Sequence, residues 1–595
     1  MFKLIGTHLK PYWLLTLLTV ALTVVQVVSN LMLPNIMSSM VNEGVLAGDL
    51  GRIFSQGWAM LAWTLVGAAA VLACDYGSSV ASMSVGRDLR REVFAKTLSL
   101  SEMDFDEVGT SSLITRTTSD VTQIERMTAT LLFTALTAPV TFVGALVMML
   151  LKASSLALAV VAGVVVVVGV VATILRRGIP LLRDLRVRID DLNQVTREGL
   201  VGVRVIRAYA KEAYEERRFS QVNAELQDAT VRTNRLMALM MPSITFVVNL
   251  VIVAVMWLGA PLVGTGGFMV GDLMAVVEYA SMVLSAITSL SLLFSITMRA
   301  IASAERITEV LSRKPSVADP ADPVALGDDE PVTLALNQVS YTFPQAEKPA
   351  LEGIDLVLEP GTTTALIGST GCGKSTLAKL LLRFADPTAG SITANGIDLR
   401  RLSQADLRRR IASVPQSTLL FSGTIADNIR YGRPEATDEE VRRAARIAQA
   451  DQFIEALPEG YGAAVAQGGR NLSGGQRQRL AIARALICRA SVYVFDDSSS
   501  ALDFATEARL RQALARELPN AAVLVIAQRI SVAMDADRVA VLDEGRVVGA
   551  GTHEELLETC SVYRQIAASQ LADEDLAAAG LSVSEGGGPH AANGR

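Results

Sequence analysis

Long apolar stretches alternate with charged, helix-patterned segments over the first 300 residues of the chain. A helix that crosses the hydrocarbon of a bilayer needs about 20 mostly apolar residues. Six stretches meet this condition, and we predict a spanning helix over each, at about residues 12–33, 58–80, 129–151, 154–175, 238–263 and 271–293. The pattern therefore predicts an all-α membrane domain over residues 1–312.

The connections between these spans differ in length and charge. Residues 81–128 and 176–237 are long, charged and helical in period, and the second is rich in arginine. Because positive charge collects on the cytoplasmic side of membrane proteins, we place both long connections there, together with Lys3 and Lys10. At about 1.5 Å per residue, about 20 extra residues would extend a membrane helix by about 30 Å into the cytosol. We therefore expect a multi-pass protein of the cytoplasmic (inner) membrane with both termini in the cytoplasm.

Composition supports a membrane domain joined to a soluble one. Hydrophobic residues make up 50% of the 595 residues and the mean hydropathy is +0.37, which favours membrane spans. Residues 313–331 read as a linker rich in Pro, Asp and Ala, residues 332–571 as a soluble domain, and residues 572–595 as a disordered tail. The net charge of −6, without a basic stripe, gives no indication of nucleic acid as a partner.

A glycine-rich loop follows a short apolar strand pattern at residues 363–367 and precedes a helix-forming run. It has the form G-x-x-x-x-G-K-S, in which backbone N–H groups surround phosphates, Lys374 supplies a positive charge and Ser375 a hydroxyl for Mg²⁺. The predicted ATP contacts here are Gly368, Ser369, Thr370, Gly371, Cys372, Gly373, Lys374, Ser375 and Thr376. This arrangement predicts an α/β phosphate-loop domain.

A second apolar strand pattern ends at Asp496, where a carboxylate is placed to hold Mg²⁺. Between the two motifs lies the run L-S-G-G-Q, with Ser473, Gly474, Gly475 and Gln476. Its two glycines free the backbone at the expected start of a helix, which favours an anion there.

This run is the signature of the ATP-binding cassette (ABC) family, which the chain resembles over about residues 1–570. The resemblance implies an exporter-type membrane domain followed by an ATP-binding cassette that hydrolyses ATP to drive transport. It also implies a second half-transporter as partner, with two cassettes arranged head to tail. The signature of each chain then covers the ATP held by the phosphate loop of the other.

Three further positions match the family's pattern. Gln416 corresponds to the Q-loop, which contacts Mg²⁺, and Asp503 to the D-loop at the dimer interface. Phe343 stands where the family usually has a Tyr that stacks on adenine, and Phe keeps the aromatic face.

Two positions depart from the family's catalytic pattern. Asp497 replaces the usual Glu after the strand-end aspartate, which sets the carboxylate back by about 1–1.5 Å, and misplacement on this scale costs about 100-fold in rate. Gln528 replaces the switch His, and Gln cannot become a cation. Alone, Asp497 is equally compatible with a tolerated conservative exchange.

Together these departures predict a heterodimeric exporter in which this chain binds ATP at an impaired site and completes the active site of its partner; a homodimer is also compatible with the sequence. The expected substrates are amphipathic small molecules, lipids or peptides. The same motifs would suit an exporter-fold importer of siderophore-like compounds, or a non-transporting, ATP-gated or regulatory membrane subunit.

Asp75 and Glu278 fall inside predicted spans, where each either faces a substrate cavity that prefers cations or forms a structural pair.

Overall fold

The computed structural model describes residues 1–264, 268–327, 330–344 and 346–570, so the predicted tail at residues 572–595 lies outside the described residues. The chain divides into two compact units. The first consists of Met1–Ser99 and Gly109–Arg313, and the second of Leu100–Val108 and the chain from Lys314 onward.

The described part of the first unit consists of helices joined by short turns. Its elements are α1 (Phe2–Leu9), α2 (Trp13–Ser39), α3 (Leu50–Ser99), α5 (Thr110–Thr115), α6 (Val121–Leu132), α7 (Thr134–Lys152), α8 (Ser154–Val201), α9 (Val203–Ala208), α10 (Glu212–Ala238), α11 (Met240–Gly264) and α12 (Val270–Ser312). Among the described residues, six helical segments are long and apolar enough to cross a membrane, which confirms the prediction of six spans. The helix α3 has 50 residues and α8 has 48, far more than the about 20 that a bilayer requires, so both continue well beyond a span.

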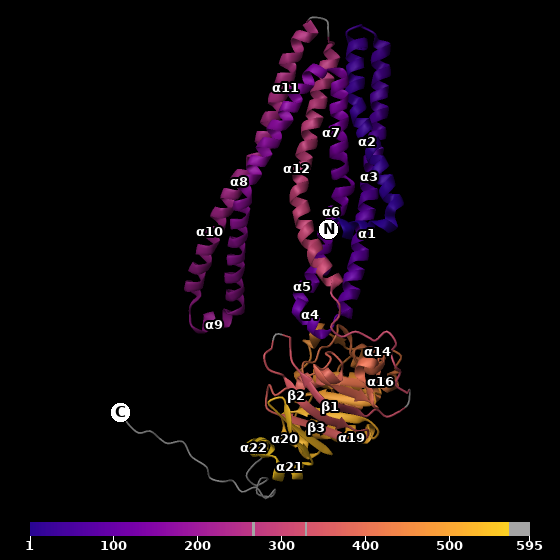
Figure 1. Ribbon diagram of the computed structural model, residues 1–595, viewed down its shortest axis with the longest axis vertical. Coiled ribbons are helices and arrows are strands. Elements are labelled where there is room, and N and C mark those ends of the chain that lie inside the picture. Colours follow the sequence, from indigo (N-terminus) through magenta and orange to yellow (C-terminus); the bar gives the residue numbers. More distant parts are fainter. Residues whose placement is uncertain (265–267, 328–329, 345, 571–595) are drawn as a thin grey trace, which may run out of the picture. The chain divides into compact units, whose positions relative to one another are not determined.

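The helices of this unit pack in two groups. In Figure 1, α2 lies beside α3, and α7 lies beside α12, while α8 runs with α10 and α11. Side chains of α2, α7, α8, α11 and α12 form one buried apolar cluster. Within it Tyr279 is fully buried and donates a hydrogen bond to the carbonyl of Leu31 at 2.9 Å, which ties α12 to α2.

The second unit contains two main sheets. The four-stranded sheet is antiparallel, with the order β2 (Leu351–Leu358), β1 (Leu334–Tyr341), β4 (Ala389–Ala394) and β5 (Ile397–Asp398). The six-stranded sheet has the order β12 (Arg546–Gly551), β11 (Arg538–Asp543), β3 (Thr363–Gly368), β10 (Ala522–Ala527), β9 (Val492–Asp496) and β6 (Ile411–Val414). All its neighbours are parallel except β11 and β12. Strands β7 (Gly423–Thr424) and β8 (Ala464–Val465) form a separate pair.

Helices connect and cover these strands. They are α4 (Glu102–Val108), α13 (Lys374–Leu381), α14 (Gln404–Arg410), α15 (Ile425–Arg430), α16 (Asp438–Ile447), α17 (Asp451–Glu455), α18 (Gly474–Leu486), α19 (Phe504–Glu517), α20 (Ile530–Met534), α21 (His553–Thr559) and α22 (Ser561–Gln570). Strands β3, β9 and β10 are almost continuously apolar because a parallel sheet is covered on both faces. An α/β domain after six spans is the predicted fold class.

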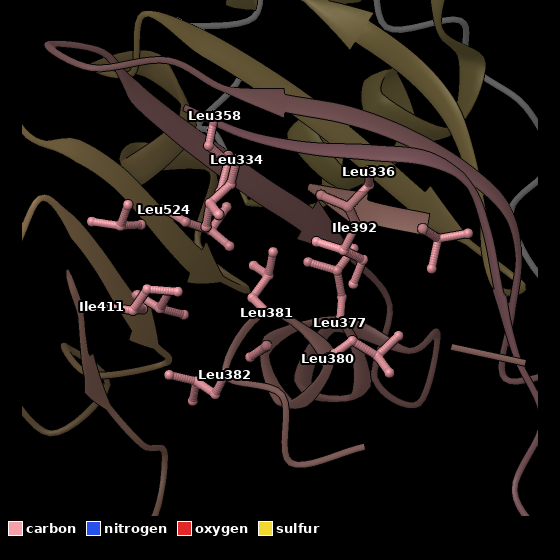
Figure 2. Close-up of a cluster of buried hydrophobic side chains, with 14 of the residues drawn as sticks. Leu334, Leu336, Leu358, Leu377, Leu380, Leu381, Leu382, Ile392, Ile411 and Leu524 are labelled. Carbon is pink, nitrogen blue, oxygen red and sulfur yellow. The ribbon is translucent and has the colours of Figure 1, made fainter. Parts of the chain in front are cut away.

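The core of this unit holds α13 against both sheets. Figure 2 shows Leu381 of α13 near Leu334 of β1, and Leu377 and Leu380 of α13 belong to the same buried cluster, as does Leu524 of β10. All five side chains are buried. Burial of a leucine side chain contributes about 2 kcal/mol, so this packing fixes the helix and, with it, the loop that precedes the helix.

Candidate nucleotide-binding site

The order of the parallel strands gathers the predicted site residues along one edge of the six-stranded sheet. The phosphate loop follows β3, Gln528 follows β10, Asp496 ends β9 and Gln416 follows β6. These four strands are consecutive neighbours and run parallel, so their carboxyl ends lie at the same edge. In open α/β sheets this is the edge at which ligands bind.

The phosphate loop depends on a glycine at the start of α13. Gly373 has φ +110°, and a Cβ atom there would lie 2.7 Å from Cδ2 of Leu351 and 2.8 Å from the carbonyl oxygen of Ala350. Only glycine adopts this conformation in so small a space at low cost. The tight turn allows the amino end of α13, where backbone N–H groups have no helical partner, to open into the loop.

Lys374 is held by the loop itself. Its ammonium group donates hydrogen bonds to the carbonyl oxygens of Gly368 at 2.7 Å and Ser369 at 2.8 Å, and the residue is 9% exposed. A buried, oriented positive charge beside free N–H groups provides a strong site for phosphate oxygens.

A cavity of about 280 Å³ opens at this loop. Predicted residues that line it are Phe343, Thr370, Gly371, Gly373, Lys374, Ser375, Thr376, Gln416, Asp496, Asp497 and Gln528, and it is completed by Ala350, Ile526 and Ala527. Phe343 packs edge-on against Tyr341, with 5.0 Å between ring centroids, and leaves an exposed aromatic face for a base. Gly368, Ser369 and Cys372 lie in the same loop without being among the lining residues.

Two neighbouring carboxylates follow β9 and have different surroundings. Burial raises the pKa of Asp496, and Ser375 donates a hydrogen bond to its carboxylate. Asp497 has φ +47°, a left-handed conformation that Asp adopts more readily than most residues. The Nε2 atom of Gln416 donates a hydrogen bond to Oδ2 of Asp497 at 3.3 Å.

The oxygen atoms of Ser375, Asp496 and Gln416 fit a magnesium ion, which prefers oxygen ligands and keeps several waters. When bound with ATP, such an ion supplies positive charge to the phosphate oxygens.

The signature residues do not line this cavity. Ser473 and Gln476 cap α18 reciprocally: Gln476 N donates to Ser473 Oγ at 3.3 Å, and Ser473 N donates to Gln476 Oε1 at 2.9 Å. Asp503 caps α19 by accepting a hydrogen bond from Thr506 N at 2.9 Å. These residues therefore form well-defined helix starts outside the chain's own nucleotide cavity.

Two glutamines that sequence reasoning missed support the site. Gln478, which is 4% exposed, donates to the carbonyl of Asp497 at 3.3 Å and accepts from Ala501 N at 3.1 Å. Gln570, at the end of α22, donates to the carbonyl of Gln528 at 2.8 Å and accepts from Ile530 N at 2.9 Å. The position of Gln478 next to the signature was a possible signal in the sequence, whereas Gln570 had none.

The chain belongs to the ABC transporter family. The ABC transporter transmembrane region matches residues 12–287, and the ABC transporter cassette matches residues 351–500. Together, the six-helix unit and the nucleotide-binding unit make this chain an ABC exporter half-transporter of the Atm1 and lipid-flippase type that binds ATP.

Relatives match along nearly the whole chain. An uncharacterised ABC transporter ATP-binding protein of Mycobacterium tuberculosis is 39% identical over 576 residues, or 96% of this chain and 98% of that protein. An ATP-dependent lipid A-core flippase of Thiobacillus denitrificans is 32% identical, with the same coverage of 96% and 98%. The structure of a bacterial Atm1-family ABC exporter with ATP bound aligns with a TM-score of 0.80 at 26% identity, over 95% of this chain and 99% of that one.

Proposed function

We propose that the chain is one half of a heterodimeric, ATP-driven exporter of the cytoplasmic membrane, with its ATP-binding unit in the cytoplasm. In this proposal its own nucleotide site binds Mg²⁺ and ATP but hydrolyses slowly, and its signature residues complete the active site of a different half-transporter.

The observation that carries the proposal is the composition of the nucleotide cavity. The cavity contains Lys374, oriented by the loop, and Ser375 beside Asp496, the groups that we propose hold Mg²⁺ and ATP. The two groups that would activate water and respond to the γ-phosphate are replaced by Asp497 and Gln528. In this proposal the cavity therefore retains the groups that bind ATP, while the groups that would cleave it are replaced.

The hydrogen bond from Gln416 further supports slow hydrolysis. The carboxylate of Asp497 is one methylene shorter than that of Glu, and one of its oxygens accepts from the Gln416 amide. A general base must reach the attacking water within about 3 Å, and a shorter, engaged carboxylate is poorly placed for this.

The signature end of the chain supports the second half of the proposal. The reciprocal cap of Ser473 and Gln476 orders the first turn of α18 and leaves the backbone N–H groups of Gly474 and Gly475 at a positive helix end. Such a surface suits the γ-phosphate of a nucleotide held by another chain.

The substrates that we propose are amphipathic: small molecules, lipids or peptides. A flippase of lipid A-core among the relatives supports this class, since an amphipathic molecule of that kind is named for that protein.

The test measures ATP hydrolysis. The chain is purified from its native membrane together with the half-transporter bound to it, and this complex is reconstituted into lipid. We expect Asp497→Ala to lower hydrolysis less than about twofold, whereas Ala at the corresponding carboxylate of the other half-transporter abolishes it. As a matched control, Lys374→Ala in this chain should remove ATP from its own site. Rapid hydrolysis by a complex made of this chain alone, lost in Asp497→Ala, would overturn the proposal.

A further inference from the structure

A second cavity, of about 410 Å³, lies in the helical unit between α7 and α12. From the α7 side it is lined by Phe133, Thr134, Thr137, Ala138 and Thr141, and from α12 by Glu278, Ser281, Met282, Ser285, Ala286 and Ser289. The spacing of three and four residues places each set on one helix face. Both helices belong to segments that are long and apolar enough to cross a membrane, where polar groups are costly and often functional.

Hydroxyl groups dominate the polar lining of this cavity, and several of them have already used their proton. Thr137 donates to the carbonyl of Phe133 at 2.7 Å, Ser281 to that of Val277 at 3.1 Å, and Ser289 to that of Ser285 at 3.1 Å. A hydroxyl has one proton and two lone pairs, so these three oxygens can only accept further hydrogen bonds. The cavity is therefore rich in acceptors.

Glu278 adds a negative charge to these acceptors. Among the described residues its carboxylate forms no hydrogen bond or ion pair. Asp272, six positions earlier on the same helix, is compensated: Lys152 Nζ lies 2.6 Å from its Oδ1, and Ser38 donates to it at 2.6 Å. One carboxylate of α12 thus has an internal cation and the other faces an open cavity.

From this contrast we infer that the α7–α12 cavity binds an organic cation with N–H donors, such as a primary ammonium or guanidinium group, attached to an apolar body. Glu278 neutralises the charge, and the hydroxyl oxygens of Thr137, Ser281 and Ser289 accept its protons. Phe133 and Met282 contact the apolar part, and an aromatic ring also attracts cations. The volume suits a small organic molecule. The inference rests on the proposed transport function and specifies the class of substrate.

The test uses two probes with the same dansyl body: dansylcadaverine, which has a primary ammonium group, and its N-acetyl derivative, which lacks the charge and keeps one N–H donor. Fluorescence titration of the full-length protein in nanodiscs without ATP measures binding. We expect saturable binding of the cation, and an increase of at least about tenfold in its Kd for Glu278→Gln. Glu278→Asp, which keeps the charge, should restore most of the affinity. The neutral derivative should bind weakly to all variants.

A matched pair tests the hydroxyl groups. Thr137→Val removes an acceptor from the cavity and should raise the Kd about threefold. Thr288→Val is the control, because Thr288 makes the same type of bond to the carbonyl of Leu284 at 3.0 Å without lining the cavity. It should leave binding unchanged. Thermal unfolding and nucleotide binding of each variant establish that the protein is folded.

Several results would overturn the inference. The first is that the neutral derivative binds as tightly as the cation, and the second is that Glu278→Gln does not change the Kd of the cation. The third is that millimolar Na⁺ displaces the probe whereas organic amines do not. The fourth is that the complex dissociates in Glu278→Gln. ATP-dependent uptake of the probe is measured separately, with the same variants in inverted membrane vesicles. Binding without uptake would contradict the proposed transport function and leave the cavity assignment intact. Uptake of lipids without binding of the cation would contradict the cavity assignment and leave the proposed transport function intact.

Discussion

The side-chain amide of Gln416 lies 3.3 Å from Oδ2 of Asp497 and donates a hydrogen bond to it. A residue that follows β6 therefore holds a carboxylate that follows the neighbouring strand β9, at the wall of the nucleotide cavity. This contact occupies one oxygen of the carboxylate that, in our proposal, replaces the catalytic base.

Lengthening this side chain should restore hydrolysis. In Asp497→Glu the carboxylate reaches about 1–1.5 Å further, and we expect single-turnover hydrolysis at this chain's own site to rise by about 10- to 100-fold. Asp497→Asn, which keeps the length and removes the charge, should give no increase. If Asp497→Glu binds ATP normally and hydrolyses it no faster than the unaltered chain, carboxylate length is not what limits this site.

The steric requirement at Gly373 predicts a specific loss of nucleotide binding. Gly373→Ala introduces a Cβ atom within 2.8 Å of the Ala350 carbonyl in addition to an unfavourable φ, and should weaken ATP binding at least tenfold and destabilise the protein by about 2 kcal/mol. Gly396→Ala is the control, since Gly396 also has a positive φ, +78°, but a Cβ atom there would meet nothing within 4 Å. It should cost about 1 kcal/mol and leave ATP affinity unchanged. Equal affinities for the two variants, measured with a fluorescent ATP analogue, would contradict this account.

Gln570 makes two hydrogen bonds to the backbone of the segment that follows β10. We expect them to protect this segment from hydrogen exchange. Gln570→Ala removes the acceptor of Ile530 N and the donor to the Gln528 carbonyl, so the amides of residues 528–534 should exchange about tenfold faster. Ser569→Ala removes a hydroxyl of the same helix that bonds only to Ile566, and should leave this segment protected. Unchanged exchange in Gln570→Ala would show that the loop is held by other contacts.

The ion pair between Arg529 and the buried carboxylate of Glu507 should matter more than a surface pair. Glu507 is 2% exposed and accepts hydrogen bonds from Arg529 at 3.0 Å and Ser499 at 2.7 Å. Arg529→Ala removes the cation of this carboxylate, and because the guanidinium is half-exposed and Ser499 still donates, it should cost about 1–2 kcal/mol and lower the unfolding temperature by about 2–6 °C. Arg443→Ala removes a partner of Glu517 at the surface and should cost less than about 1 kcal/mol. Similar unfolding temperatures for the two variants would rule out the buried pair as a major source of stability.

Acid should weaken the ion pairs at the start of α16. The guanidinium of Arg433, the backbone N–H of Thr437 and the charge of Arg489 lower the pKa of Glu440 from 4.5 to about 2. A carboxyl group whose pKa is lower in the folded protein stabilises it fully above its unfolded pKa, and this contribution is lost as the pH falls from about 4.5 toward 2. The unfolding temperature of Glu440→Gln should therefore fall less between pH 5 and pH 3 than that of the unaltered chain. The difference should correspond to the titration of about one carboxyl group. Parallel pH profiles for the variant and the unaltered chain would contradict this.

Local patterns in the sequence were sufficient for the spans and the phosphate loop, because each depends on residues that are adjacent along the chain. Gly368 to Ser375 form one strand–turn–helix, and the spans need only apolar length. The contacts of Gln570 with Gln528 and of Lys152 with Asp272 join residues 42 and 120 positions apart. Only the packing of helices brings these partners together, so no local pattern indicates them. The same holds for Glu278: its place in a span was readable, but the face on which it lies was not.

Gln478 couples the start of α18 to the turn that follows β9. Its buried amide binds the backbone of Asp497 and of Ala501, so this side chain is one of the links between the helix that begins at the signature and the turn after β9. Separation of these two segments would leave both polar ends of a buried amide unpaired, at a cost of several kcal/mol. The two segments should therefore open and exchange their amide protons as one cooperative block.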